Sequence, residues 1–381
     1  MKRAPLLVAL VASVCALPRL SAQTTWTVDP TGAGGALTSI QAAVDAASSG
    51  DTILVRAGRY AESVVVDFGL RVLADPGVIL DGDGSGPALQ VVDVAAGETV
   101  TWFGMRIDGP DAKVLLRECV GAVHLELFEF TKSSATDRLT VDRCDHVTIA
   151  DSEVYGSPAM RLQGGRIVLT ECTAAVPLGT TAREAALIHT CTTTIVGGHF
   201  VGGSALGQVA PGIVVVNDSL TLTGNVRVEA GDPSPLTRRG SALRSTQADV
   251  IIDPSVTFES QGGAPELQGG GFTWRVVPYV ASTPFTPGSF WALDVYAPVG
   301  TPFALFASTT TPPVPTSFGD LWLDPSVGIL AAATAIPPPF ARYQVRYAAA
   351  ALPPGLPIVA QAFTLLGSTV EATNPAIRIV R

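Results

Sequence analysis

The densest group of ionisable side chains in this 381-residue sequence is the run Asp-Arg-Cys-Asp-His from Asp142 to His146. Two carboxyl groups that flank a groove can serve as the acid and base of glycoside hydrolysis, so Asp142 and Asp145 are the candidate catalytic residues. The apolar residues around them alternate with polar ones, and a solvated outer face of a strand produces the same pattern. A catalytic pair and a solvated face both fit this run, and the solvated face is the simpler interpretation.

Arginines form a second candidate site. Arg238 and Arg239 lie in a long interruption of the strand pattern, and Arg244 follows shortly after it. Loops that leave a regular scaffold often build binding sites, and the planar guanidinium group suits uronate carboxylates or sulfate esters. We therefore treat these arginines as candidate ligand-binding residues. The alternative is a solvated loop whose charge favours solubility.

Two further patterns suggest ligands but have simpler explanations. Asp81-Gly-Asp-Gly84 is similar to the start of a calcium loop, yet Val92 stands where an EF-hand-type loop has its glutamate. We expect a turn there, with no metal and no other cofactor. Trp274, Trp291 and Trp322 could form a sugar-stacking platform, but Trp274 and Trp291 lie in apolar runs that favour core packing.

Four cysteines reveal a repeat. Each has apolar residues five and three positions before it and another three to five positions after it: Cys119, Cys144, Cys172 and Cys191. Short strands repeating every 20 to 30 residues or so predict stacked coils, which lie about 4.8 Å apart. That spacing is compatible with disulfides in an exported chain, so the bridges Cys119–Cys144 and Cys172–Cys191 are one prediction. Buried free thiols are the alternative.

The N-terminus has the layout of a secretory signal peptide. Met1–Arg3 is basic, Ala4–Leu17 is apolar and uncharged, and cleavage is best placed after Ala22. The apolar run is too short to span a bilayer, and no later run is long enough. The leader holds three of the 24 basic residues, so 21 remain against 33 acidic ones. This excess of acid argues against nucleic acid as a partner, and we expect a monomeric protein that is secreted or held at the cell surface.

Glycine and proline divide the mature chain. Before residue 272 lie 32 of the 38 glycines, whereas 16 of the 29 prolines follow Trp274. Residues 261–271 have no periodic apolar pattern, so they are predicted to be a linker between two domains. Short β-rich runs predict a β-solenoid over residues 23–260. Seven more strand-like runs with proline-rich turns predict a β-sandwich over residues 272–381.

The start of the mature chain combines a helix with a distinctive turn. An amphipathic helix, begun by the capping box Thr38–Gln41, precedes a β-rich run and a turn that contains Gly58, Tyr60 and Glu62. Over residues 28–66 this order resembles the opening of pectin-lyase-like right-handed β-helix proteins, in which a helix plugs the end of the solenoid. The resemblance implies an all-β fold, namely a right-handed parallel β-helix with an N-terminal capping helix. It says little about activity, because lyases, hydrolases, esterases, adhesins and scaffolds share this fold.

The catalytic signatures of these enzymes are missing from the sequence. In place of the polygalacturonase motifs Gly-His-Gly and Arg-Ile-Lys, the chain has Gly198-His-Phe200 and Arg166-Ile-Val168, and the pectate-lyase tetrad Trp-Ile-Asp-His is absent. We therefore expect a non-catalytic protein that binds a polysaccharide or a cell-surface glycan. The alternative is a lyase or hydrolase acting on acidic glycans, and a third possibility is a purely structural envelope protein.

Overall fold

The computed structural model describes residues 23–380, except 110–111, 132–136, 178–181, 206–207, 233–239, 286–288, 325, 340 and 349–351. The predicted signal peptide, Arg238 and Arg239 lie outside the described residues. No helix among the described residues is long and apolar enough to cross a membrane.

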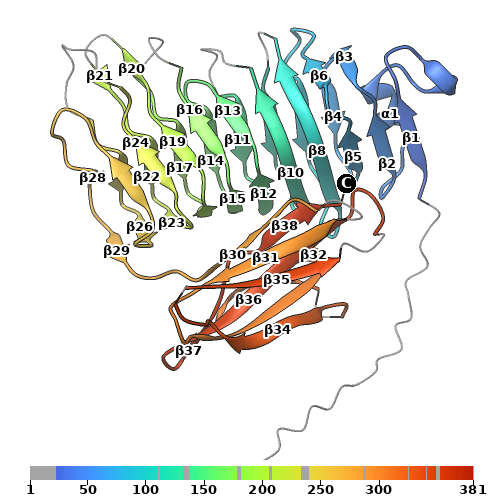
Figure 1. Ribbon diagram of the computed structural model, residues 1–381. Helices are drawn as coiled ribbons and strands as arrows, with labels where there is room; N and C mark the ends of the chain where they lie inside the picture. The colour runs from blue at the N-terminus through green and yellow to red at the C-terminus, as the bar shows by residue number, and fades with distance from the viewer. Residues whose placement is uncertain are drawn as a thin grey trace, which may run out of the picture.

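Residues up to Trp274 form a parallel β-helix, which confirms the predicted solenoid (Figure 1). Each coil runs through three faces in the same order, which we call B, A1 and A2. Face B contains β4 (Val64–Val66), β7 (Leu89–Val92), β9 (Val114–Arg117), β11 (Leu139–Asp142), β14 (Met160–Gln163), β17 (Ala186–His189), β22 (Ile213–Val216), β25 (Leu243–Thr246) and β28 (Leu267–Gln268).

Faces A1 and A2 share the long strands β8 (Thr99–Asp108) and β10 (Ala122–Phe130), whose first halves belong to A1 and second halves to A2. Face A1 also contains β1 (Thr25–Val28), β2 (Thr52–Val55), β5 (Arg71–Ala74), β12 (His146–Ala150), β15 (Arg166–Thr170), β18 (Thr192–Val196), β23 (Ser219–Thr223), β26 (Asp249–Ile252) and β29 (Phe272–Trp274). Face A2 also contains β3 (Gly58–Ala61), β6 (Val78–Asp81), β13 (Glu153–Tyr155), β16 (Thr173–Ala175), β19 (His199–Val201), β24 (Arg227–Glu229) and β27 (Thr257–Glu259). A short hairpin, β20 (Ser204–Ala205) and β21 (Gln208–Val209), leaves the solenoid after β19.

Alternation along each strand builds the core. Parallel register places Val114, Leu139 and Met160 side by side on face B, and all three are buried. The residues between them, such as Thr140 and Arg161, point away from the core. Because every coil repeats this arrangement, one continuous apolar cluster runs through the solenoid.

Sharp corners between faces B and A1 use the left-handed backbone conformation in one coil after another. The residues at this corner are Asp93, Glu118, Arg143, Gly164, Thr190, Asn217 and Gln247, all with positive φ. Apart from glycine, asparagine is the residue that most readily adopts this conformation. Only one of these corner residues is asparagine, so the sequence does not reveal the corners. At Gly165, the next position, a Cβ atom would lie 1.6 Å from the carbonyl oxygen of Cys144, so glycine is required there.

The predicted capping helix is confirmed as α1 (Ile40–Ala46), which packs against the first coil. Its N-cap is Ser39, one residue later than the start of the predicted capping box, and the Ser39 hydroxyl accepts from the Ala42 amide at 3.1 Å. The Glu62 carboxylate accepts from the Ile40 and Gln41 amides at 2.7 and 3.0 Å. The turn that resembled the family therefore supplies the acidic cap of the plug helix.

The cysteines correct part of the predicted coil register. Cys119 and Cys144 do occupy the same corner of adjacent coils, because Val114 pairs with Leu139. Cys172 follows a strand of face A1, however, whereas Cys191 follows a strand of face B, so the predicted Cys172–Cys191 equivalence is wrong. All four cysteines are buried free thiols, and neither predicted bridge is formed. The cysteine repeat predicted the wrong position for Cys172 because apolar and polar residues alternate in the same way in the strands of every face.

The predicted linker also needs correction. Within residues 261–271, β28 pairs with β25. Directly after this segment, β29 pairs with β26. These strands belong to the last coil of the solenoid, and the chain leaves it only after Trp274. Residues 261–271 are rich in glycine and poor in apolar residues, so the sequence pattern did not predict a strand there. The last coil has no neighbour beyond it that would cover a longer apolar run.

The remaining strands form antiparallel sheets, which we call the C-terminal sheets. One contains β30 (Tyr279–Ser282), β31 (Phe290–Tyr296) and β35 (Arg342–Ala348). The other contains β32 (Pro302–Thr316), β33 (Gly319–Leu323), β34 (Ile329–Ala335), β36 (Pro357–Leu366), β37 (Thr369–Ala372) and β38 (Ala376–Ile379). Apolar side chains of both sheets share one core. The assignment of this region as a separate β-sandwich domain stays a prediction.

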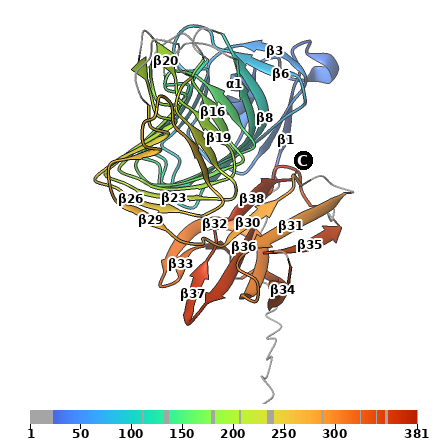
Figure 2. The ribbon, with the colours of Figure 1, turned by 60° about the vertical axis from the view of Figure 1, so that its left-hand side comes forward.

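The C-terminal sheets pack against face A1 of the solenoid (Figures 1 and 2). Two small apolar clusters join the parts: one contains Phe103 and Ile379, and the other contains Val168 and Trp322. Between these clusters, the Ile379 amide donates to the Glu126 carboxylate at 2.8 Å. The C-terminal sheets therefore cover a face that would otherwise be open to solvent.

Candidate functional site

Of the predicted catalytic pair, Asp142 lines a hollow on face B together with Arg117 and Arg161, and Asp145 is not among the described residues that line it. Asp142 lies at the end of β11, 3.4 Å from the Arg143 guanidinium, which also contacts Glu118. Asp145 is exposed on the far side of the corner, where the chain turns towards face A1. Arg244 is exposed on β25, four strands further along face B, or roughly 19 Å away at the usual strand spacing. Among the residues that the structure describes, Asp142 and Arg244 thus do not meet.

His146, in the same predicted cluster, has a different environment from the one expected. It points out of the solenoid as predicted, but the C-terminal sheets cover it and leave it 8% exposed. Its ring meets the Trp322 ring edge to face, with centroids 6.2 Å apart. The alternation correctly gave the direction of the side chain, and a second layer of protein then excluded the solvent.

A hollow lies where the C-terminal sheets diverge from face A1, and we call it the interface cleft. It has a volume of about 170 Å³. The solenoid supplies arginine and threonine side chains, and the C-terminal sheets supply acidic, amide and aromatic ones. Its polar and aromatic lining residues are Arg166, Thr192, Thr194, Thr221, Arg275, Asp320, Trp322, Glu371, Thr373 and Asn374.

Two ion pairs cross the interface cleft. The Arg166 Nε donates to Asp320 at 3.0 Å, and the Arg275 Nη1 donates to both Glu371 oxygens at 2.8 and 3.0 Å. All four side chains keep 30 to 40% of their surface exposed, so each pair contributes little to stability. Their effect is geometric, because they hold charged hydrogen-bonding groups of both signs at the walls of one hollow.

Parallel register arranges threonine hydroxyls along the floor of the cleft. Thr192 lies beside Arg166 in the next coil, and Thr194 lies beside Thr221. Trp322 is only 3% exposed, so it forms part of the wall and is not a stacking platform. Trp291 is buried as predicted, whereas Trp274 is 54% exposed at the open end of the solenoid, contrary to the prediction of core packing.

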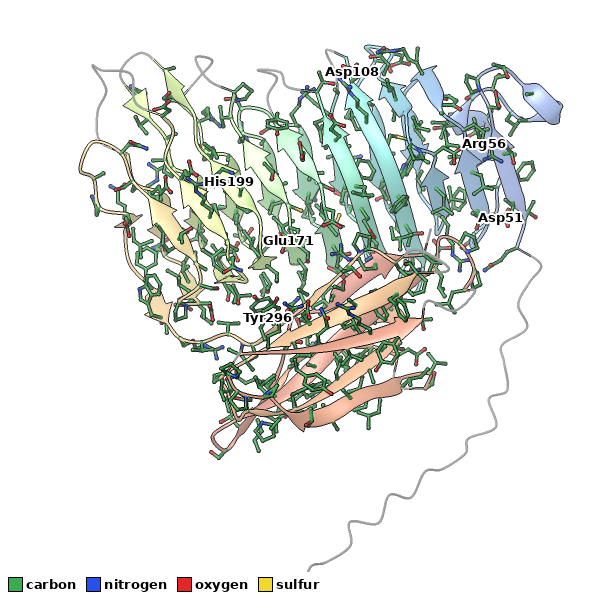
Figure 3. The ribbon with its side chains drawn as sticks, viewed as in Figure 1. Asp51, Arg56, Asp108, Glu171, His199 and Tyr296 are labelled. Carbon is green, nitrogen blue, oxygen red and sulfur yellow. The ribbon has the colours of Figure 1, made fainter. Side chains whose placement is uncertain are left out.

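Face A2 carries a second cluster of charged groups, which sequence reasoning missed. The His199 Nε2 lies 2.7 Å from Glu229, and Arg227 contacts both Glu229 and Glu259. Figure 3 shows His199 away from the C-terminal sheets, whereas Glu171 lies near Tyr296 at the junction. Sequence reasoning could not find this cluster, because His199, Glu229 and Glu259 are each 30 positions apart in the chain. They meet only through the coil register.

The predicted turn at Asp81–Gly84 is occupied by internal contacts. Asp83 accepts hydrogen bonds from Ser85 and Ser63, which lower its pKa to about 2, and Asp81 pairs with Arg59. Among the described residues, no three histidine, cysteine or acidic side chains are grouped to hold a metal ion. The expectation of no cofactor stays a prediction.

Comparison with known proteins found similarity among solved structures alone. No protein-family model matches it, and no curated protein matches it. Among solved structures, rice weevil pectin methyl esterase is 14% identical and has a TM-score of 0.23, with 69% of this chain and 92% of the esterase covered.

Two phage tailspikes are also similar. Tailspike protein 2 of Escherichia coli O157:H7 bacteriophage CAB120 is 10% identical with a TM-score of 0.33, covering 89% of this chain and 65% of the tailspike. Tailspike gp49 of Acinetobacter baumannii bacteriophage Fri1, a capsular polysaccharide depolymerase, is 9% identical with a TM-score of 0.24, covering 85% and 81%. These TM-scores lie below 0.5, so the likenesses say nothing about what this chain does.

Proposed function

We propose that this chain is a secreted, non-catalytic β-helix protein that binds a polysaccharide or cell-surface glycan in the interface cleft. The observation that carries the proposal is the convergence of Arg166, Arg275, Asp320 and Glu371 with a row of threonine hydroxyls in one hollow. Sugars present many hydroxyl groups that both donate and accept hydrogen bonds. A wall with guanidinium donors, carboxylate acceptors and hydroxyl groups satisfies both kinds.

The same geometry argues against catalysis in the cleft. Glycoside hydrolysis needs one protonated carboxyl group to deliver a proton to the leaving oxygen. Asp320 and Glu371 are each neutralised by an arginine, so neither is placed to deliver a proton. A lyase needs a group that removes a proton, and the two carboxylates of the cleft are each engaged by a guanidinium group. Neither histidine nor lysine is among the described residues that line the cleft.

One observation favours the enzymatic alternative. The hydrogen-bonded pair of His199 and Glu229 is an arrangement that orients a general base, with Arg227 beside it. It lies on an open strand face, however, where the His199 side chain is 38% exposed. We therefore place glycan binding first.

The proposal is tested by a glycan array with the mature protein and two matched variants. Arg275→Met removes a cleft guanidinium, and Arg244→Met removes an exposed one from face B. We expect wild type and Arg244→Met to bind the same glycan and Arg275→Met to bind at least tenfold more weakly, as loss of a charged hydrogen bond predicts. If Arg244→Met loses binding and Arg275→Met retains it, the site is on face B. If no glycan binds, the proposal fails.

A further inference from the structure

Two histidines are sealed between the solenoid and the C-terminal sheets. His124 on β10 is 2% exposed, and its neighbour His146 on β12 is 8% exposed. Both project from face A1 into the interface, where β32 and β33 cover them. The ordinary pKa of histidine is about 6.5, so burial of this side chain makes an interface sensitive to mild acid.

Both ring nitrogens of His124 contact hydroxyl groups. Nδ1 lies 2.6 Å from the Thr148 hydroxyl on the solenoid, and Nε2 lies 3.4 Å from the Thr310 hydroxyl on β32. Threonine hydroxyls donate or accept equally well, so they satisfy the neutral ring and do not compensate a positive charge. The carboxylate two residues along the same strand, Glu126, accepts from the Ile379 amide.

Burial and Arg166 outweigh the two carboxylates, Asp145 and Asp320, that favour protonation of His146. His146 lies in the next coil, two positions from Thr148, which pairs with His124, and its charge opposes protonation of His124. Around His146 stand Asp145, Arg166 and Asp320, and the last two pair with each other. Further along the interface, Arg378 pairs with Asp151 at 2.8 Å.

We propose that the docking of the C-terminal sheets on face A1 is released by mild acid, through protonation of His124 and His146 in the undocked form. Release opens the interface cleft, because one wall of that cleft belongs to the C-terminal sheets. The device is independent of which glycan the cleft binds.

The direction and size of the effect follow from the ring environments. Burial lowers the pKa of His124 to about 3, with a smaller effect from His146, and burial also lowers the pKa of His146. The docked form therefore stays neutral while the undocked form takes up protons as the pH falls below about 6.5. Between pH 7.5 and 5.5, His124 alone raises the undocking equilibrium constant about tenfold, and His146 adds to this.

This pH window separates the histidines from the carboxylates. Ordinary carboxyl groups, by contrast, protonate mainly below pH 5. A change that appears only below pH 5 would therefore come from the carboxylates.

Hydrogen exchange of the whole mature chain tests the proposal. After correction for the intrinsic exchange rate, protection of the Ile379 amide should fall at least tenfold from pH 7.5 to 5.5. The Leu162 amide in the solenoid core should keep its protection, which shows that the solenoid stays folded. Unchanged protection of Ile379 between these pH values would overturn the proposal.

Variants then assign the effect. His124→Gln keeps hydrogen-bonding groups but cannot be protonated, so the pH dependence should shrink by about tenfold, whereas His199→Gln on face A2 should leave it unchanged. If His124→Gln fails to dock, titration of the His124 ring in the wild-type protein by NMR decides instead. A His124 pKa near 6.5 in the docked protein would contradict the mechanism.

Discussion

The buried guanidinium of Arg378 offers a direct test of how the two parts of the chain are held together. Its side chain is 3% exposed and donates to Asp151 at 2.8 Å, to the Ser282 hydroxyl at 2.9 Å and to the Ser282 carbonyl at 2.7 Å. Arg378→Met keeps most of the apolar stem and removes all three hydrogen bonds. Removing one partner of a buried ion pair costs about 3 to 5 kcal/mol.

The environment of Asp151 places the expected cost near the lower end of that range. This carboxylate keeps 21% of its surface exposed, so water can partly replace the lost guanidinium. We expect the docked state to lose about 3 kcal/mol, which corresponds to roughly a hundredfold increase in undocking. Native-state hydrogen exchange of the Ile379 amide at pH 7.5 measures this change, because that amide bonds across the interface.

The matched control is Arg342→Met, which breaks the 2.8 Å pair between Arg342 and Asp294 within the C-terminal sheets. Arg342 is 44% exposed, so its loss should cost less than about 1 kcal/mol. A double-mutant cycle with Asp151→Asn isolates the coupling across the interface. Exchange at Ile379 that changes less than threefold in Arg378→Met would refute the idea that this pair holds the parts together.

Three further outcomes are expected. Burial raises the pKa of the Cys172 and Cys191 thiols to about 12, so these two should not react with a maleimide at pH 7.5 in the native mature protein, and four should react after denaturation; fewer than four would reveal bridges. Glu62→Gln should lower the free energy of unfolding by about 1 kcal/mol through the weakened cap of α1, measured by urea denaturation, and no loss would mean that the cap is unimportant. Gly165→Ala should prevent stable folding, whereas Gly263→Ala, with open space around it, should cost about 1 kcal/mol; equal losses would contradict the corner geometry.

The strands of the solenoid could be predicted from the sequence because each one is formed by a local alternation of apolar and polar residues, and this alternation repeats in every coil. Alternation identified strands such as β11 and β12, and the capping box Thr38–Gln41 identified the plug helix. Alternation does not say which face a strand joins, so Cys172 was given the wrong corner. It also does not say what covers an outward side chain, so His146 was expected in solvent.

The candidate site was beyond sequence reasoning for a related reason. Arg166 and Asp320 are more than 150 positions apart, and they meet only because the chain folds back along face A1 after Trp274. The charged run at Asp142 was more conspicuous, yet Asp142 pairs with the neighbouring Arg143. Density of charge along the chain was therefore a poor guide to convergence of charge in space.

Binding without cleavage is the central claim, and incubation with defined polysaccharides tests it most directly. The mature protein is mixed with the glycan found on the array and with pectate, alginate and chondroitin, each with and without Ca²⁺. Ultraviolet absorbance detects unsaturated uronates, a reducing-end assay detects hydrolysis, and chromatography gives the polymer length. We predict that the bound glycan is recovered at its original length with no new reducing ends and no rise in absorbance. Shortened chains that disappear with His199→Gln would contradict the account and place an enzyme on face A2.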